Sequence, residues 1–216
     1  MVPYFKVLSG KSDITIAARN ISERGPGLEG NYRKLHGGLS NIDFLYFHSD
    51  KEYKELYSDE KDKRWAFKYT DKYQLNENVQ VEVDWSKASD SLVLRDISGE
   101  ITSIGSEREQ YLNQNISITG EFKNLILKIE QEKNQSLNPL LTNGYEKSPS
   151  VDLSFFKNIG NFLFRENLNI SYFKADALHG FFGIKHSNKY LSSLEEIKEG
   201  SRTVSYTHLT LPTNGC

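Results

Sequence analysis

Cysteine and methionine are almost absent from this sequence, which has one of each in 216 residues. A single cysteine, Cys216, cannot form an internal disulfide or a cysteine-ligated zinc site, so neither is expected to hold the fold together. An excess of one charge is also lacking, because 27 basic and 29 acidic residues leave a net charge of -2. Without a basic field to gather phosphates, we expect no nucleic acid partner.

Long hydrophobic runs are missing as well. No stretch approaches the 18 or more apolar residues that a membrane-spanning helix needs. This excludes spanning by helices but not by strands, because a membrane-spanning strand needs only about 9–11 residues with every second side chain apolar. A hydrophilic composition is therefore compatible with a barrel.

The strongest positive signal is an alternation of apolar and polar residues with a period of two. Residues 79–86 read VQVEVDWS, so three valines and a tryptophan alternate with polar side chains. Successive side chains on a strand point to opposite faces, and this segment is therefore predicted to be a strand with one apolar and one polar face. The same pattern predicts strands over residues 2–8, 14–20, 28–35, 42–49, 64–70, 115–122, 125–130, 151–156, 160–164, 167–172 and 181–186.

The connections between these segments come in two lengths. Short ones are predicted at 9–13, 74–78 and 123–124, and long polar ones at 50–62, 87–109 and 133–150. Short turns at one end and long loops at the other are typical of outer-membrane barrels. We predict an all-β fold, an incomplete antiparallel up-and-down transmembrane β-barrel with about 10–12 strands of a larger barrel.

The end of the sequence is set apart from this barrel. Residues 204–213 read VSYTHLTLPT, which resembles a translated sequencing adaptor. We therefore assign residues 1–203 to a partial outer-membrane β-barrel and predict that residues 204–216, with Cys216, are a non-native tail.

Alternation alone fits a soluble β-sandwich as well as a membrane barrel, and the two differ in what the apolar face touches. Aromatic residues near strand ends favour the barrel, where they are expected at the membrane interfaces. The candidates for these interfacial positions are Tyr46, Trp65, Tyr69 and Trp85. Polar residues on the opposite side are expected to face the lumen, and the candidates are Lys68, Glu82, Asp84 and Asn169.

No enzymatic arrangement stands out. The histidines His36, His48, His179 and His186 are scattered without metal-ligand spacing, so no metal site and no cofactor are predicted. The carboxylate of Glu82 lies on the same strand face as that of Asp84, but such pairs are ordinary on a solvated face. We expect a protein that is not an enzyme.

Two groups of residues have an order and spacing specific enough to suggest a family. The first is VPYF at 2–5, DITI at 13–16, Arg19, Ser22, Arg24, Gly25, Gly30, Tyr32 and Arg33. The second is Arg64, Trp65, Phe67, VDWSKASD at 83–90 and Asp96. Together they resemble, over about residues 2–96, the early barrel strands of the LptD family. Beyond residue 96 we find no further family residues, and only the alternation of apolar and polar residues continues.

The resemblance implies a role in moving lipopolysaccharide to the outer leaflet of a Gram-negative outer membrane. It implies a very large barrel plugged by the lipoprotein LptE, and periplasmic Lpt bridge proteins that deliver the lipid. Outer-membrane lipid would surround the barrel. The alternatives are another outer-membrane barrel, such as a porin or a receptor-gated transporter, or a secreted carbohydrate-binding β-sandwich.

Pro3 matches a proline that the family has in its second strand, beside the seam where its first and last strands meet. Proline has no N–H to donate to a strand ladder, so it weakens a sheet locally. The resemblance therefore makes Pro3 the candidate for a lateral gate, through which acyl chains would reach the bilayer while the sugars stay in the lumen.

Overall fold

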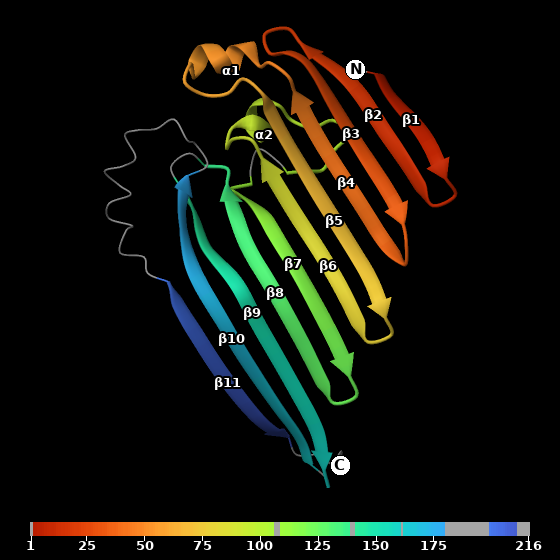
Figure 1. Cartoon of the computed structure of the whole chain (residues 1–216), viewed down its shortest axis with the longest axis vertical. Helices are drawn as coiled ribbons and strands as arrows, with labels where there is room; N and C mark the ends of the chain where they lie inside the picture. Colours follow the sequence, from red (N-terminus) through yellow and green to blue (C-terminus); the bar gives the residue numbers. More distant parts are fainter. Residues whose placement is uncertain (1, 106–108, 139–140, 161, 180–198, 211–216) are drawn as a thin grey trace, which may run out of the picture.

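The sheet of this protein is built from consecutive hairpins. The structure, a computed structural model, describes residues 2–105, 109–138, 141–160, 162–179 and 199–210. In these residues eleven strands form one antiparallel sheet whose order is the order of the sequence (Figure 1). They are β1 (Val2–Ser9), β2 (Ser12–Ile21), β3 (Gly25–Leu35), β4 (Gly38–Phe47), β5 (Arg64–Asn76), β6 (Val79–Ala88), β7 (Tyr111–Phe122), β8 (Leu125–Ser136), β9 (Thr142–Ile159), β10 (Phe162–His179) and β11 (Gly200–Thr210).

The connections at the two ends of the sheet differ in length. The β1–β2, β3–β4, β5–β6 and β7–β8 turns are tight, and we call this the short-turn end. The opposite end carries the long connections, which contain helix α1 (Lys51–Leu56) and helix α2 (Val93–Asp96). We call it the covered end. Asp50 is the N-cap of α1, and its carboxylate accepts a hydrogen bond from the backbone N–H of Tyr53 at 3.0 Å.

Two predicted boundaries were wrong. The long loop expected at 133–150 is wrong over most of its length, because β8 runs to Ser136 and β9 begins at Thr142. The charged residues that suggested a loop pair across the two strands, as Lys147 does with Glu132. The strands expected at 160–164 and 167–172 are parts of the single strand β10, and the one expected at 181–186 lies outside the described residues.

Strand register separates the sheet into two faces. Cross-strand partners project to the same side, and one series of partners runs from Gln80 through Thr119, Lys128 and Asp152 to Asn169. We call this side the polar face. The opposite side, the apolar face, carries the three valines of β6, Ile116 and Ile118 of β7, and Ile129 of β8.

The apolar face has no second layer in the described part of the chain. Ile118 is 46% exposed, Ile129 43% and Ile170 45%. A β-sandwich would bury these side chains against an opposing sheet, so the sandwich alternative is wrong for this segment. Within the described ranges the sheet is open, and β1 and β11 each pair with one neighbour. The prediction of an all-β, antiparallel, up-and-down and incomplete barrel is confirmed.

Strand β11 includes part of the segment that was set apart in the sequence. Residues 204–210 pair with β10 in regular antiparallel register, from Asn169 to Leu163. The non-native origin of residues 204–216 stays a prediction. Neither helix in the described ranges is long and apolar enough to cross a membrane.

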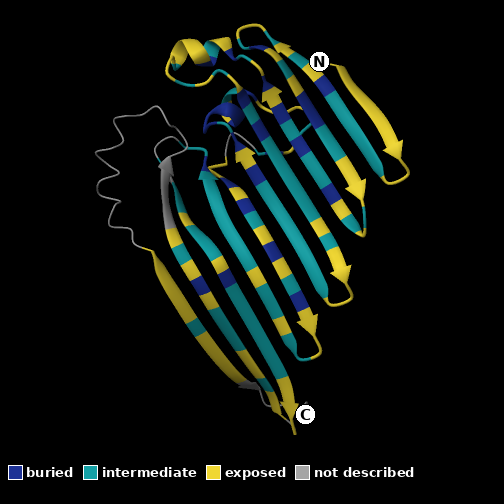
Figure 2. Ribbon diagram, viewed as in Figure 1, coloured by how far each residue is buried: buried dark blue, intermediate teal, exposed yellow. Residues whose placement is uncertain are grey.

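The buried core lies at the covered end (Figure 2). Its residues Leu45, Ala66 and Ala88 are cross-strand partners that belong to the polar face. Phe47, which is fully buried, belongs to this core. Its ring lies over Gly27 of the neighbouring strand, where an added Cβ would come within 2.5 Å of the ring. Glycine at this position therefore lets β3 and the aromatic ring pack closely.

Candidate functional site: the polar face and the loop that covers its end

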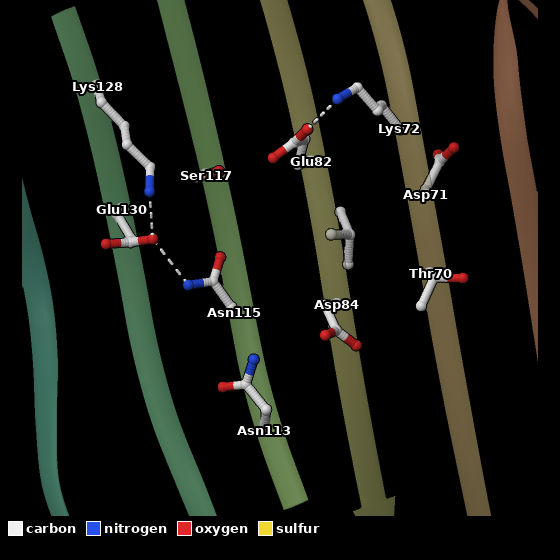
Figure 3. Close-up of a pocket in the computed structure, with 11 residues that line it drawn as sticks. Thr70, Asp71, Lys72, Glu82, Asp84, Asn113, Asn115, Ser117, Lys128 and Glu130 are labelled. Carbon is white, nitrogen blue, oxygen red and sulfur yellow. Dashed lines mark hydrogen bonds and ion pairs between the residues drawn. The ribbon is translucent and has the colours of Figure 1, made fainter. Parts of the chain in front are cut away.

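The polar face carries a groove across β5–β8, which we call the charged groove (Figure 3). It has a volume of about 380 Å³. Residues that line it include Thr70, Lys72, Glu82, Asp84, Asn113, Asn115, Ser117, Lys128 and Glu130. Every second residue of four adjacent strands contributes to it, because alternate side chains share a face.

Opposite charges in the charged groove are paired across strands. Lys72 Nζ lies 2.7 Å from a carboxylate oxygen of Glu82, and Lys128 Nζ lies 2.6 Å from one of Glu130. The same oxygen of Glu130 accepts a hydrogen bond from Asn115 Nδ2 at 2.8 Å. The groove is thus a hydrated surface of mixed donors and acceptors. Such a surface suits a ligand rich in hydroxyl groups and gives no cohesion to acyl chains.

The four predicted lumen residues all lie on the polar face, but only two of them meet. Glu82 and Asp84 both line the charged groove, and Oδ1 of Asp84 is buried with no hydrogen-bond partner among the residues that the structure describes. Lys68 pairs in register with Asp43 and Ser86, nearer the covered end. Asn169 lies on β10, where its side chain donates to Asp152 at 2.5 Å.

The four predicted interfacial aromatics all lie on the apolar face, in two cross-strand pairs. Tyr46 is the partner of Trp65, and Tyr69 is the partner of Trp85. Tyr46, Trp65 and Trp85 lie near an end of their strands, whereas Tyr69 lies in the middle of β5. Their place at a membrane interface stays a prediction.

The predicted gate residue, Pro3, lies on the edge strand β1, opposite Ala17 of β2. Strand β1 is exposed along its whole length and has no partner on its other side in the described residues.

One long connection folds back over the polar face at the covered end. We call residues 89–105, which include α2, the inner loop. Val93, Leu94 and Ile97 of this loop are buried. They form a cluster with residues that project from the strands, among them Leu45, Phe47, Ala66 and Ala88. The polar face carries these apolar side chains at the covered end because the inner loop packs over them and excludes water.

Glu29 is the polar anchor of the inner loop. Its side chain is fully buried, and its Oε1 accepts the backbone N–H groups of Glu100, Ile101 and Thr102 at 2.8–3.0 Å. The Thr102 hydroxyl donates to the same oxygen at 2.9 Å. Arg19 lies 3.1 Å from the other carboxylate oxygen and also donates to the carbonyl of Ser98 at 2.7 Å. The carboxylate thus replaces water for three consecutive N–H groups.

A buried ion network joins the two long connections. Arg64 is fully buried and donates to both carboxylate oxygens of Asp90, at 2.8 and 3.0 Å. It also donates to Asp50 at 2.9 Å and to Asp96 at 3.1 Å. Its guanidinium lies 4.1 Å from the ring centroid of Tyr53 in α1. One cation on β5 therefore binds the N-cap of α1, Asp90 just before α2 and Asp96 at the end of α2.

The carboxylate of Asp50 is charged and satisfied within this network. Burial raises its pKa. The N–H of Tyr53 and the guanidinium groups of Arg64 and Arg24 lower it by a larger amount, so the pKa lies below its ordinary value. The Tyr53 hydroxyl has a raised pKa, mainly because it is buried.

Sequence reasoning missed the anchoring role of Glu29 and of this network. Arg24, Arg64, Asp90 and Asp96 had been noticed only as residues that carry a family resemblance, and the structure brings them within ion-pair distance of one another. Glu29 gave no local signal, because its partners lie about 70 residues further along the chain. No group of acidic, histidine or cysteine side chains in the described ranges is arranged to hold a metal ion.

Comparison with known proteins gives a family match over most of the chain. The model of the family described as "LptD: LPS transport system D" matches residues 62–215. The LPS-assembly protein LptD of Salmonella paratyphi A is 26% identical over 160 residues, which cover 73% of this chain and 20% of that protein. The LptD of Ectopseudomonas mendocina is 24% identical and matches 70% of this chain and 16% of that protein.

The chain therefore spans about a fifth of the length of these curated relatives. Among solved structures, the outer membrane channel DcaP of Acinetobacter baumannii aligns with 95% of this chain and 61% of its own. The TM-score is 0.38 and the identity 10%. The family match reaches well beyond residue 96, where the resemblance noticed in the sequence had ended.

Proposed function

This chain belongs to the LPS transport system D family, and from that premise we propose that the full-length protein inserts lipopolysaccharide into the outer leaflet of the outer membrane. The proposed location is the outer membrane of a Gram-negative bacterium. The proposed partners are the lipoprotein LptE, as a plug, and the periplasmic Lpt bridge proteins. Transport, and not an enzymatic reaction, is the proposed activity.

The observation that carries this proposal is the difference between the two faces of one sheet. The apolar face exposes Ile118, Ile129 and Ile170 by more than 40% each, with no layer over them in the described residues. The polar face presents the paired charges of the charged groove. A sheet with hydrocarbon on one side and water on the other suits a glycolipid carrier, since acyl chains and sugars need different solvents.

We further propose that the lipid leaves sideways at the edge that carries Pro3. Pro3 of β1 has no N–H to offer to a strand on the side away from β2. A seam that contains this strand would form fewer ladder hydrogen bonds than a seam of ordinary residues. It would therefore part at lower cost.

Replacing Pro3 with Ala in the full-length protein tests the lateral opening. The variant restores one N–H to the edge strand, so we expect a tighter seam, slower delivery and less lipopolysaccharide at the cell surface. The measurement is surface lipopolysaccharide and antibiotic permeability in cells that depend on the variant gene. Pro26→Ala is the matched control, since Pro26 lies in the interior strand β3. Equal surface lipopolysaccharide in the two variants would refute the gate.

A further inference from the structure

The apolar face carries a cluster of polar side chains at the short-turn end of β3–β5. Ser40 of β4 and Asp71 of β5 are cross-strand partners, and they lie on the same face as Tyr69, two residues before Asp71. Ser40 is buried, and the side chain of Asp71 is 15% exposed. His36, just after β3, places its Nε2 3.1 Å from Oδ1 of Asp71. A carboxylate is thus held on the face that otherwise exposes isoleucine and valine.

Three side chains surround the carboxylate of Asp71. Ser40 Oγ donates to Oδ1 at 3.0 Å, and the Tyr69 hydroxyl donates to Oδ2 at 2.9 Å. Nε2 of His36 lies against the same Oδ1 and is also hydrogen-bonded to Ser40. These residues do not form a hydrolytic triad, because a triad needs a separate imidazole nitrogen for the serine and for the carboxylate. A carboxylate has about four acceptor positions, so Asp71 can accept from a further donor.

The sheet itself does not require a carboxylate at this position. The partner of Asp71 on the next strand is Val83, and the partner of Val83 is Ile116. Neighbouring strands thus place hydrocarbon side chains in the same row. An ionisable side chain on a membrane-facing surface is costly and marks a functional site by default.

The same row also contains a cation. Lys34 of β3 is the partner of Ser40, so Lys34, Ser40 and Asp71 follow one another across three strands, and we call them the charged row. Lys34 is exposed, and in the described residues no carboxylate lies within 4.0 Å of its ammonium group. Two strand spacings separate the backbones of Lys34 and Asp71 by about 10 Å. The charged row therefore presents one positive and one negative group with a hydroxyl between them.

We propose that the charged row binds the headgroup of a phospholipid that carries both a phosphate and a primary ammonium group. The ammonium group would donate to Asp71, and the phosphate would lie against Lys34. The acyl chains would run toward the covered end over Ile42 and Phe44, which follow Ser40 on the same face. A headgroup with negative charge alone would fit less well, because it would bring like charges together at Asp71.

The position of the charged row defines the leaflet. Short turns are periplasmic in outer-membrane barrels, so the lipid would belong to the periplasmic leaflet. This inference rests on the proposed membrane location and not on the transport of lipopolysaccharide. The lipid would be a bound component of the barrel wall, on the side of the sheet opposite the charged groove.

The test is a titration of the purified full-length protein in detergent with phosphatidylethanolamine or with phosphatidylglycerol of the same acyl chains, followed by native mass spectrometry. The unmodified protein should bind phosphatidylethanolamine more tightly. Asp71→Asn removes the charge that attracts the ammonium group, so affinity for phosphatidylethanolamine should fall about tenfold, which corresponds to about 1.4 kcal/mol. Affinity for phosphatidylglycerol should not fall. Lys34→Gln should weaken binding of both lipids, and it changes an exposed side chain that the fold does not need.

Matched controls come from the same end of the sheet. Glu121→Gln and Lys123→Gln change exposed charges outside the charged row and should leave both affinities unchanged. Equal affinity of the unmodified protein for the two lipids, or an unchanged preference in Asp71→Asn, would overturn the inference. An equal loss in the controls would do the same. Surface lipopolysaccharide in dependent cells tests the proposed function separately, since a protein that exports lipopolysaccharide without this lipid preference refutes the charged row alone.

Discussion

The two ends of the polar face are built from the same alternating strands but are stabilised in different ways. At the covered end, Arg64 and Glu29 are fully buried, and the inner loop excludes water from them. Toward the short-turn end, the ion pair of Lys72 and Glu82 has side chains that are 67% and 47% exposed. Buried charges depend on each other for stability, whereas exposed pairs are replaceable by water. The comparison separates a structural anchor from a hydrated surface.

The largest expected effect is the replacement of Arg64 with Met. This leaves the carboxylates of Asp50, Asp90 and Asp96 without their shared cation. Breaking a buried ion network in this way costs about 3–5 kcal/mol. Urea unfolding of the full-length protein in detergent measures the loss. The control is Arg95→Gln, since Arg95 is exposed and contacts only the outer side of the same network. An equal, small loss in both variants would remove the distinction between the two ends.

The next effect is the pH dependence of the covered end. The pKa of Asp50 is lowered in the folded protein, so its contribution to stability is complete above the unfolded-state value of about 4. It is lost as the pH falls from there through the folded value. The free energy of unfolding should therefore decrease on acidification below about pH 4 by more in the unmodified protein than in Asp50→Asn. Parallel pH curves would contradict the assigned role of Asp50.

A smaller and local effect is expected for Glu29→Gln. The variant loses the charge that attracts Arg19 and three backbone N–H groups, at a cost of about 1–3 kcal/mol. Hydrogen exchange at residues 98–104 should become faster while the strands stay protected. Glu100→Gln, which changes an exposed partner of Arg19, is the control. Global loss of protection, rather than local loss, would mean that the inner loop is part of the barrel's cooperative core.

The smallest effect is expected for Lys72→Gln in the charged groove. An exposed ion pair contributes about 0–1 kcal/mol, so the unfolding midpoint should barely move. The same urea titration that is used for Arg64 gives the comparison directly. A loss as large as that of Arg64→Met would show that the charged groove is itself a structural network and not a hydrated surface.

Much of the fold was predictable because apolar and polar residues alternate along most of the strands. The two faces of β6 were read from residues 79–86, and the short turn at 123–124 was placed correctly. The failures were in β8 and β9, where charged residues pair across strands and both faces are polar near the covered end. Alternation disappears there, so a strand looks like a loop.

The candidate site was predictable only in part, for a related reason. Membership of the polar face follows from the period of two, and Lys68, Glu82, Asp84 and Asn169 share that face in the structure. That this face lines a lumen stays a prediction. Which of them meet depends on register across neighbouring strands, and this brought only Glu82 and Asp84 into the charged groove.

The sequence by itself determined that this is a sheet of hairpins with one apolar and one polar face, because side-chain direction on a strand depends only on position along it. It also carried the residues by which the family could be suspected. Only the tertiary structure decided that the inner loop folds onto the polar face, with Glu29 and Arg64 as its anchors. Those contacts join residues that are 26 to 73 positions apart in the sequence. A local sequence pattern cannot indicate which residues so far apart come into contact.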